Sequence, residues 1–233
     1  MGAVVLGRVG GAIGAARLAA WAALVLVVGG LNFAGRQAGG APDRDVLYRY
    51  STAVSGVVLY AIVLGLLLLV ARGLDMREVL ALRRPRSWWT AAGYVGGGIL
   101  AIFLVGSLLG QFLDAGREQG LVPTRWQPDH AGAFAANFVV VVLVAPFVEE
   151  LVFRGFGVTA LCGYAGPLTV SAAVGVAFGV WHGLVIAFPA LAILGAILAA
   201  IRLRTDSVFP AMATHALFNA ISLVAAVTIA GAA

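Results

Sequence analysis

The chain has 233 residues, of which 62% are hydrophobic and only 11% are charged. A soluble globule of this size needs more polar surface, so the composition excludes a soluble protein and predicts an integral membrane protein. All 15 basic residues are arginine and the formal net charge is +5, but the arginines stand between apolar runs, which indicates membrane topology and lipid contact and argues against nucleic-acid binding.

The N-terminal part, residues 1–131, is predicted to form three membrane-spanning helices with their loops. Arg8 and Arg17 precede the apolar run 18–34, a pattern that signal peptides share with first transmembrane helices. No clear small-x-small cleavage site follows promptly, which favours a retained helix. Two further runs are long enough to cross a bilayer. They cover residues 53–71 and 88–113.

The remaining part, residues 132–233, is predicted to complete one all-α polytopic membrane bundle with about seven transmembrane helices. It contains 47 consecutive residues without a formal charge, twice what one crossing needs, so that run holds two spans. The predicted elements are a helix from Ala131 to near Cys162, two spans within Gly155–Ile201 that a break at Gly183–Pro189 separates, and a last span at Ser207–Ile229.

The arginines also predict the orientation of the bundle. Positively charged loops stay in the cytoplasm, and placing the N-terminus there leaves nine arginines inside and five outside. The nine are Arg8, Arg17, Arg72, Arg77, Arg83, Arg84, Arg86, Arg202 and Arg204, and the five are Arg36, Arg44, Arg49, Arg117 and Arg125. An all-arginine chain rich in alanine and glycine is typical of a GC-rich bacterium, so the expected location is a bacterial plasma membrane.

Two adjacent carboxylates and a guanidinium follow the uncharged run 131–148. Each charge at the centre of a membrane helix costs about 2.5 to 3.5 kcal/mol on insertion scales. Glu150 and Arg154 share one helix face and can neutralise each other, whereas Glu149 is rotated by about 100° and has no local partner. An unpartnered carboxylate in a membrane protein indicates a functional site; a purely structural ion-pair cluster is the alternative.

Two more pairs with a four-residue spacing place polar side chains on single faces of apolar helices. The pairs are Phe178 with His182 and His215 with Asn219. Taken separately, each histidine is more typical of a hydrogen bond between helices than of catalysis. However, Glu149 and His182 lie about 16 or 17 residues on either side of a turn near 164–167, so both are expected roughly 25 Å from it, at matching depth.

Three motifs therefore occur in order on separate predicted helices: Glu149-Glu150-x-x-x-Arg154, Phe178-x-x-x-His182 and His215-x-x-x-Asn219. They closely resemble the motifs of the CPBP family, the CAAX protease and bacteriocin-processing (Abi) group that includes the eukaryotic Ras-converting prenyl endopeptidase. The resemblance covers roughly residues 130–225, while the first three spans match only in being apolar. It implies an intramembrane endopeptidase that cleaves a peptide bond near the membrane surface.

The resemblance also implies a role for each motif residue. Glu149 would be the general base that deprotonates a water, and His182 would help to orient and activate that water. His215 and Asn219 would stabilise the oxyanion, a task that suits His and Asn donors on one face. Glu150, Arg154 and Phe178 would support these four.

A metal-free site of the glutamate type is favoured, with no cofactor. Two histidines and a glutamate can also hold zinc with one open position, so zinc on Glu149, His182 and His215 is the alternative. The spacing is not the His-Glu-x-x-His pattern of zincins. Cys162 is the single cysteine, which excludes a multi-cysteine site and an intramolecular disulfide.

Three other function classes remain open at this point. A non-catalytic membrane scaffold or bacteriocin-immunity protein could use the same fold. An ion-coupled transporter could use buried Glu and His residues, although transporters usually have duplicated halves and none is visible. A b-type haem protein could use His182 and His215 as ligands. The expected partners are the lipid bilayer and a peptide or protein substrate, with no nucleic acid.

Overall fold

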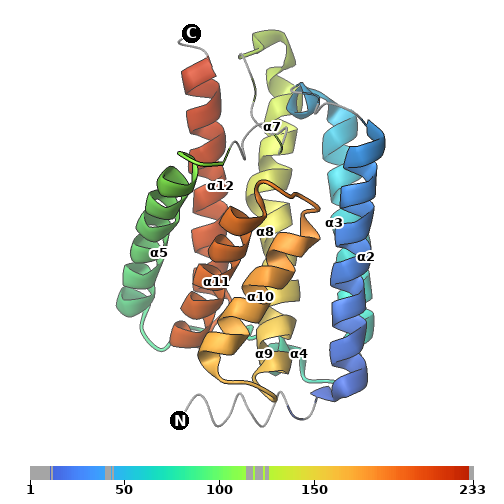
Figure 1. The fold of residues 1–233 in the computed structure, drawn as a ribbon, viewed down its shortest axis with the longest axis vertical. Coiled ribbons are helices and arrows are strands. Elements are labelled where there is room, and N and C mark those ends of the chain that lie inside the picture. The colour runs from blue at the N-terminus through green and yellow to red at the C-terminus, as the bar shows by residue number, and fades with distance from the viewer. Residues whose placement is uncertain are drawn as a thin grey trace.

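The computed structural model describes residues 11, 13–39, 43, 45–113, 118, 123 and 126–230. All regular structure within these residues is helical, which confirms the predicted all-α bundle. Its long helices run alongside one another (Figure 1). The elements are α2 (Ala15–Gly39), η1 (Val46–Tyr48), α3 (Tyr50–Val70), α4 (Met76–Val79), α5 (Trp88–Leu109), η2 (Pro128–His130), α7 (Ala131–Val139), η3 (Val140–Val144), α8 (Ala145–Glu150), η4 (Leu151–Gly157), α9 (Val158–Leu161), α10 (Pro167–Trp181), α11 (Phe188–Thr205) and α12 (Phe209–Ala230).

Six helices in the described part of the chain are long and apolar enough to cross a membrane. They are Ala15–Gly39, Tyr50–Val70, Trp88–Leu109, Pro128–Leu161, Phe188–Thr205 and Phe209–Thr228. A seventh apolar helix, α10, has 15 residues and is therefore roughly 22 Å long, shorter than the hydrocarbon core of about 30 Å. The seven predicted crossings thus correspond to six long helices and one short one.

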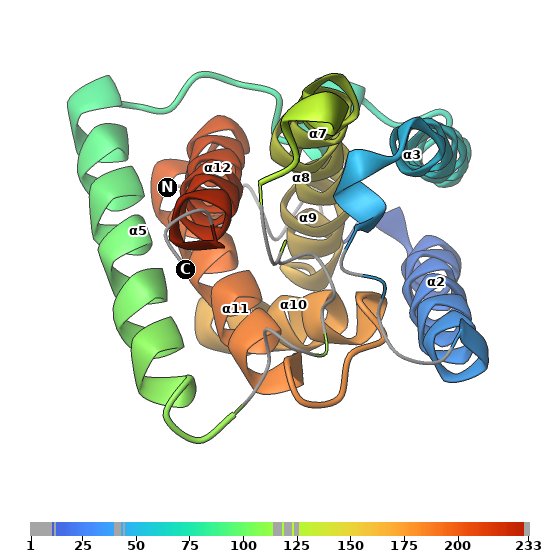
Figure 2. The ribbon, with the colours of Figure 1, turned by 90° about the horizontal axis from the view of Figure 1, so that it is seen from above.

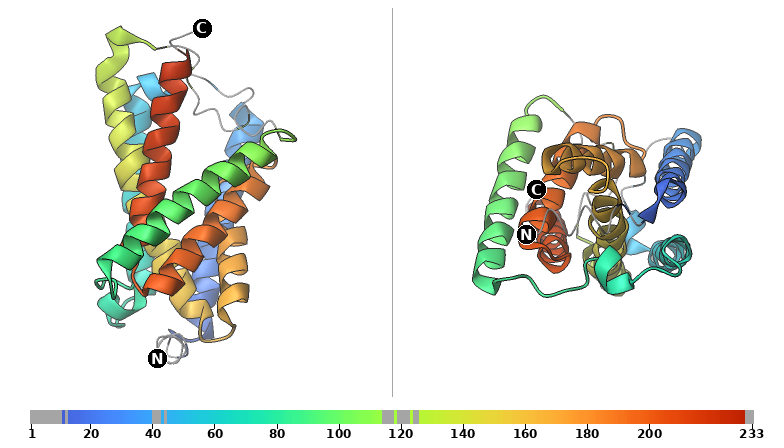
Figure 3. Two further views of the ribbon diagram at one scale, coloured as in Figure 1. Left: turned by 90° about the vertical axis from the view of Figure 1, so that its left-hand side faces the viewer. Right: turned by 90° about the horizontal axis from the view of Figure 1, so that it is seen from below.

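The elements from η2 to α9 form one continuous helix that carries both adjacent glutamates. Seen from above, this helix and α12 lie in the middle of the bundle, with α5 at one edge and α2 and α3 at the opposite edge (Figure 2). A side view shows α5 running obliquely across α11 and α12 (Figure 3). The three motifs lie on α8, α10 and α12 and on the segments that adjoin them.

Helices α10 and α11 form a tightly packed hairpin. A Cβ atom added to Gly175 would lie 2.8 Å from the backbone nitrogen of Ala196, and one added to Gly195 would lie 2.9 Å from the Cα of Gly175. Glycine is needed at both positions because only it lets two helix backbones approach so closely. This contact fixes the position of α11 relative to the motif on α10.

The end of α10 is held from α2. The Asn32 side-chain amide donates a hydrogen bond of 2.7 Å to the Trp181 carbonyl, and Gly183 then turns the chain with a φ of +60°, a conformation that glycine adopts without strain. His182 lies between Trp181 and Gly183 in the chain. Its position is therefore fixed by the contact with α2 and by the turn.

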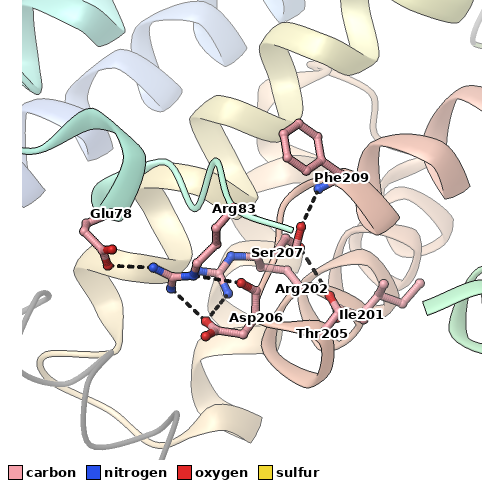
Figure 4. Close-up of polar contacts among 8 residues, drawn as sticks. All are labelled: Glu78, Arg83, Ile201, Arg202, Thr205, Asp206, Ser207 and Phe209. Carbon is pink, nitrogen blue, oxygen red and sulfur yellow. Dashed lines mark hydrogen bonds and ion pairs between the residues drawn. The ribbon is translucent and has the colours of Figure 1, made fainter. Parts of the chain in front are cut away.

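Arg83 fixes the turn between α11 and α12. Its Nε donates to the Asp206 carbonyl at 2.9 Å, and its Nη2 reaches Asp206 Oδ1 at 2.7 Å (Figure 4). Its Nη1 pairs with Glu78 Oε2 at 2.6 Å, while the buried Arg202 contacts the same Asp206 oxygen at 3.3 Å. Because α12 begins three residues after Asp206, this cluster sets the register of the helix that carries His215.

Several described arginines lie near the two ends of the bundle, whereas Arg154 is buried inside it. Arg17 donates a hydrogen bond to the Arg72 carbonyl, and Arg83 contacts Asp206 beside the end of α11. Arg36 lies near the opposite end of α2, where it donates to the Glu118 carbonyl. Arg8, Arg44, Arg117 and Arg125 lie outside the described residues.

Candidate active site

Two π-helical segments flank α8, the short helix that ends in Glu149 and Glu150. They are η3 before it and η4 after it. Pro146 accounts for the first segment, because proline has no N–H for the carbonyl four residues earlier and its ring crowds that carbonyl. Wide π-helical turns inside α-helices are rare and frequently occur at functional sites.

Each π-helical segment offers a backbone carbonyl to a side chain from another helix. Asn219 of α12 donates from Nδ2 to the Val141 carbonyl at 2.8 Å, and Trp21 of α2 donates from Nε1 to the Val152 carbonyl at 2.9 Å. These donors give both carbonyls a hydrogen-bond partner from outside the central helix. They also tie α12 and α2 to the turns on either side of the two glutamates.

Glu150 is paired inside the bundle. Arg154 Nη1 lies 2.8 Å from Glu150 Oε1, and both side chains are completely buried. Arg154 Nη2 donates to the Gly195 carbonyl of α11 at 2.9 Å. The ion pair expected from the four-residue spacing is therefore present, and it also connects the central helix to α11.

His215 lies between the two carboxylates. Its Nδ1 is 3.0 Å from Glu150 Oε1, whereas its Nε2 is 3.8 Å from Glu149 Oε2. Since a carboxylate only accepts hydrogen bonds, the short contact requires the proton on Nδ1. The Nε2 atom of a neutral ring is then a hydrogen-bond acceptor that faces a second acceptor, at a separation too long for a direct hydrogen bond.

Glu149 has a partner that sequence reasoning missed. Tyr60 of α3 donates from its hydroxyl to Glu149 Oε1 at 2.5 Å. Tyr60 has the only hydrogen-bonding side chain between residues 56 and 71, but a tyrosine in a membrane helix is too common to indicate a site, and its spacing to Glu149 is not local. Glu149 itself is 3% exposed.

Phe178 joins the two histidines and the ion pair. Its ring centroid is 4.7 Å from the His182 ring and 5.5 Å from the His215 ring, edge to face in both cases. The guanidinium carbon of Arg154 lies 4.5 Å above the Phe178 ring, within the range of a cation–π contact. The supporting role predicted for Phe178 thus has a physical basis in these three contacts.

His182 is oriented by its own helix. Its Nδ1 lies 2.8 Å from the Phe178 carbonyl, and because a carbonyl only accepts, Nδ1 carries the proton. The Nε2 atom is then the free nitrogen of the ring. The His182 ring contacts Phe178, whose ring also contacts His215.

The structure thus brings the predicted residues of three separate helices into one region. Glu149, Glu150, Arg154, Phe178 and His215 are buried, while His182, Asn219 and Tyr60 are partly exposed. The contact of Asn219 with Val141 was not predicted.

The predicted zinc ligands do not form a ready metal site. Among the described residues, no group of three His, Cys, Asp or Glu side chains is arranged to hold a metal ion. His215 and His182 use Nδ1 to contact Glu150 and a backbone carbonyl, so Nε2 is the nitrogen of each ring that could bind a metal. No catalytic step is assigned to a metal, and metal independence stays a prediction.

Comparison with known proteins identifies a matching protein family. Residues 131–221 match the family model described as type II CAAX prenyl endopeptidase Rce1-like, which confirms the resemblance predicted from the three motifs. The matched segment contains every predicted site residue, whereas Tyr60, Asn32 and Trp21 lie outside it. No curated protein and no solved structure matches the chain.

Proposed function

Because residues 131–221 match the family model described as type II CAAX prenyl endopeptidase Rce1-like, we propose that this membrane protein is an intramembrane endopeptidase that hydrolyses peptide bonds with a glutamate-activated water. The observation that carries this proposal is the difference between the adjacent glutamates. Glu150 is paired with Arg154 at 2.8 Å, whereas no arginine in the described part of the chain pairs with Glu149, which keeps one oxygen facing His215 across 3.8 Å. Glu149 is therefore the carboxylate that we assign as the base.

The reacting water is proposed to lie between Glu149 Oε2 and His215 Nε2. Two acceptors about 3.8 Å apart suit one water that donates a hydrogen bond to each, since each such bond is about 2.8 Å long. Glu149 takes a proton from this water while the water oxygen attacks the carbonyl carbon of the substrate. Glu149 then returns the proton to the leaving amine, in the role of a general acid.

The neighbouring groups orient this base and water. Glu150 holds His215 in one tautomer, as a carboxylate does in a Ser-His-Asp triad, and Arg154 holds Glu150. His182, with its proton fixed on Nδ1, presents Nε2 to help orient the water or the substrate amide.

The oxyanion of the tetrahedral intermediate is proposed to be stabilised by Asn219 and by His215. The Asn219 amide has two N–H donors, so it can hold the Val141 carbonyl with one and serve the oxyanion with the other. His215 donates from Nε2 only while its ring holds the proton that Glu149 took from the water, and it passes this proton back through Glu149 for transfer to the leaving amine. In a soluble protease, loss of one such donor costs about 2.7 to 4 kcal/mol in kcat.

The substrate is proposed to be a peptide segment of a membrane-associated protein. The matched family description refers to CAAX prenyl endopeptidases, and a farnesylated CAAX peptide is therefore one probe. Quantitative proteomics of membrane peptides is the more general test, because cells with the wild-type protein and cells with Glu149→Gln should differ in the substrate and its products.

Single substitutions test the site, and they are assayed on the peptide that the proteomic comparison identifies. Glu149→Gln, His182→Ala and His215→Ala should each reduce cleavage to a small residual rate while the proteins still insert into the membrane. His130→Ala is the matched control, because His130 is exposed in η2 and should leave cleavage unchanged. A cellular phenotype that Glu149→Gln leaves untouched would instead support the non-catalytic scaffold or immunity protein.

The location is proposed to be a bacterial plasma membrane with the N-terminus in the cytoplasm. The excess of arginine at the end that holds Arg17, Arg72 and Arg83 supports this orientation. Cys162 follows α9 near that end, and it is the only cysteine. Replacing Cys162 with alanine and placing a single cysteine at position 77 allows labelling with a membrane-impermeant maleimide. Labelling in intact cells would show that the N-terminus and Arg77 lie outside the cytoplasm and would contradict the proposed orientation.

A further inference from the structure

Tyr60 reaches the candidate base from outside the segment that matches the family. Its helix, α3, ends at Val70, well before the matched residues 131–221 begin. Its phenol donates to Glu149 Oε1 at 2.5 Å. Within the described part of the chain, no other side chain forms a direct hydrogen bond with this carboxylate.

The contact leaves the two oxygens of Glu149 in different surroundings. An ionised carboxylate only accepts hydrogen bonds, so the phenol is the donor and covers Oε1. The other oxygen, Oε2, is then directed at His215 Nε2. The last torsion of a glutamate side chain is broad and weakly restrained, so without this anchor the carboxylate plane can rotate away from His215.

The backbone around Tyr60 is held close to the central helix. A Cβ atom added to Gly56, one turn earlier on α3, would lie 2.9 Å from the Val140 side chain. Val140 begins the π-helical segment that precedes the glutamates. The close approach of α3 to η3 therefore brings the phenol within reach of Glu149.

We propose that Tyr60 is a positioning residue of the endopeptidase site, whose phenol holds Glu149 Oε1 so that Oε2 faces the reacting water. The inference rests on the proposed function, because it assigns Glu149 as the base. The proposal makes α3 part of the active site, although the family match covers only residues 131–221, from α7 into α12.

The first test is Tyr60→Phe, which removes the hydroxyl and keeps the ring. The kcat for the identified peptide should fall about 10- to 100-fold, the range for a lost hydrogen bond to a charged group, with KM nearly unchanged. Tyr50→Phe is the matched control on the same helix, since Tyr50 is exposed at the start of α3, and it should keep wild-type kcat. Wild-type kcat in Tyr60→Phe would overturn the proposal.

A second measurement separates positioning from general damage to the fold. Dicyclohexylcarbodiimide modifies carboxyl groups in apolar surroundings, and mass spectrometry can distinguish Glu149 from Glu150 in one peptide. Tyr60→Phe should raise modification of Glu149 several-fold, because its Oε1 is uncovered, while Glu150 stays unmodified in its ion pair. Equal modification of Glu149 in both proteins, or modification of both glutamates, would contradict the positioning role.

Kinetics of the double variant separate this inference from the proposed function. If Tyr60 acts through Glu149, adding Tyr60→Phe to Glu149→Gln should cause no further loss of the residual rate. A further loss equal to that in the single variant would show that Tyr60 acts independently of Glu149. Full activity of Glu149→Gln alone would refute the proposed function, whatever Tyr60→Phe does.

Discussion

Asn219 donates a 2.8 Å hydrogen bond from its side-chain amide to the main-chain carbonyl of Val141. The bond joins α12 to the π-helical segment that precedes Glu149. Asn219 is also the proposed oxyanion donor, and the two roles are compatible because its amide carries two N–H groups. One side chain can therefore hold the shape of the central helix and also serve the reaction.

Substituting Asn219 should affect both stability and activity. Asn219→Ala leaves the Val141 carbonyl without its donor, so the free energy of unfolding should fall by about 1 to 3 kcal/mol. The kcat should fall by about 100-fold, as for one lost oxyanion donor. Thermal unfolding in detergent and steady-state kinetics measure the two effects.

Thr228→Ala is the control for Asn219→Ala, because Thr228 is exposed near the C-terminal end of α12 and its hydroxyl donates hydrogen bonds to carbonyls of its own helix. It should change neither quantity. Lost activity at unchanged stability in Asn219→Ala would mean that the contact with Val141 does not stabilise the bundle.

The fold and most of the site could be predicted because their signals are local. Turn residues mark where the predicted helices end: the central helix ends at Leu161, next to the expected Cys162, and α11 begins at Phe188, after the break at Gly183. The four-residue spacing of Glu150 and Arg154 predicts a shared face, and the structure pairs them at 2.8 Å. Such features depend on residues close together in the chain.

The missed features depend on contacts between distant segments. Tyr60 and Glu149 meet only because α3 packs against the central helix, and no spacing rule relates them. The π-helical turns needed both Pro146, visible in the sequence, and outside donors such as Asn219 and Trp21, whose partners are main-chain atoms. Main-chain carbonyls have no sequence signature, so contacts of this kind cannot be found by comparing motifs.

Arg154 is expected to be essential for folding because it neutralises a buried carboxylate. Arg154→Met leaves Glu150 charged and unpaired in the bundle, which should lower the free energy of unfolding by about 3 to 5 kcal/mol. Adding Glu150→Gln removes the stranded charge and should restore much of this stability, but not the activity, since His215 loses the carboxylate that fixes its tautomer.

Thermal unfolding of the Arg154→Met single variant and of its double variant with Glu150→Gln measures this coupling. Arg77→Met is the control, because Arg77 is exposed on α4. Equal stability of wild type and Arg154→Met would show that the ion pair is not needed. Full activity of the double variant would contradict the role of Glu150 in orienting His215.

Strong chelation should leave cleavage largely unchanged. The described residues include no group of three metal-ligating side chains arranged around one point, and the proposed base needs no metal to activate water. Incubation with 1,10-phenanthroline, followed by kinetics on the identified peptide, tests this expectation beside a zinc metalloprotease treated in parallel. A reversible loss of activity that added zinc restores would establish a metalloprotease instead.

The glycine contact between α10 and α11 should be intolerant of even one methyl group. A Cβ at Gly175 would lie 2.8 Å from the backbone nitrogen of Ala196, and a backbone atom cannot move aside as a flexible side chain can. Overpacking of this kind costs about 1 to 3 kcal/mol. Gly175→Ala should therefore lower the thermal midpoint in detergent and, by displacing the Gly195 carbonyl that holds Arg154, reduce kcat.

Gly65→Ala provides the matched comparison, because Gly65 lies in the middle of α3 and nothing lies within 4 Å of its added Cβ. Replacing a glycine inside a helix with alanine stabilises the helix by about 0.8 to 1 kcal/mol, so the midpoint should stay the same or rise. If Gly175→Ala proved as stable and as active as Gly65→Ala, the two helices would not pack as closely as described. The position of Arg154 would then not depend on where α11 and its Gly195 carbonyl lie.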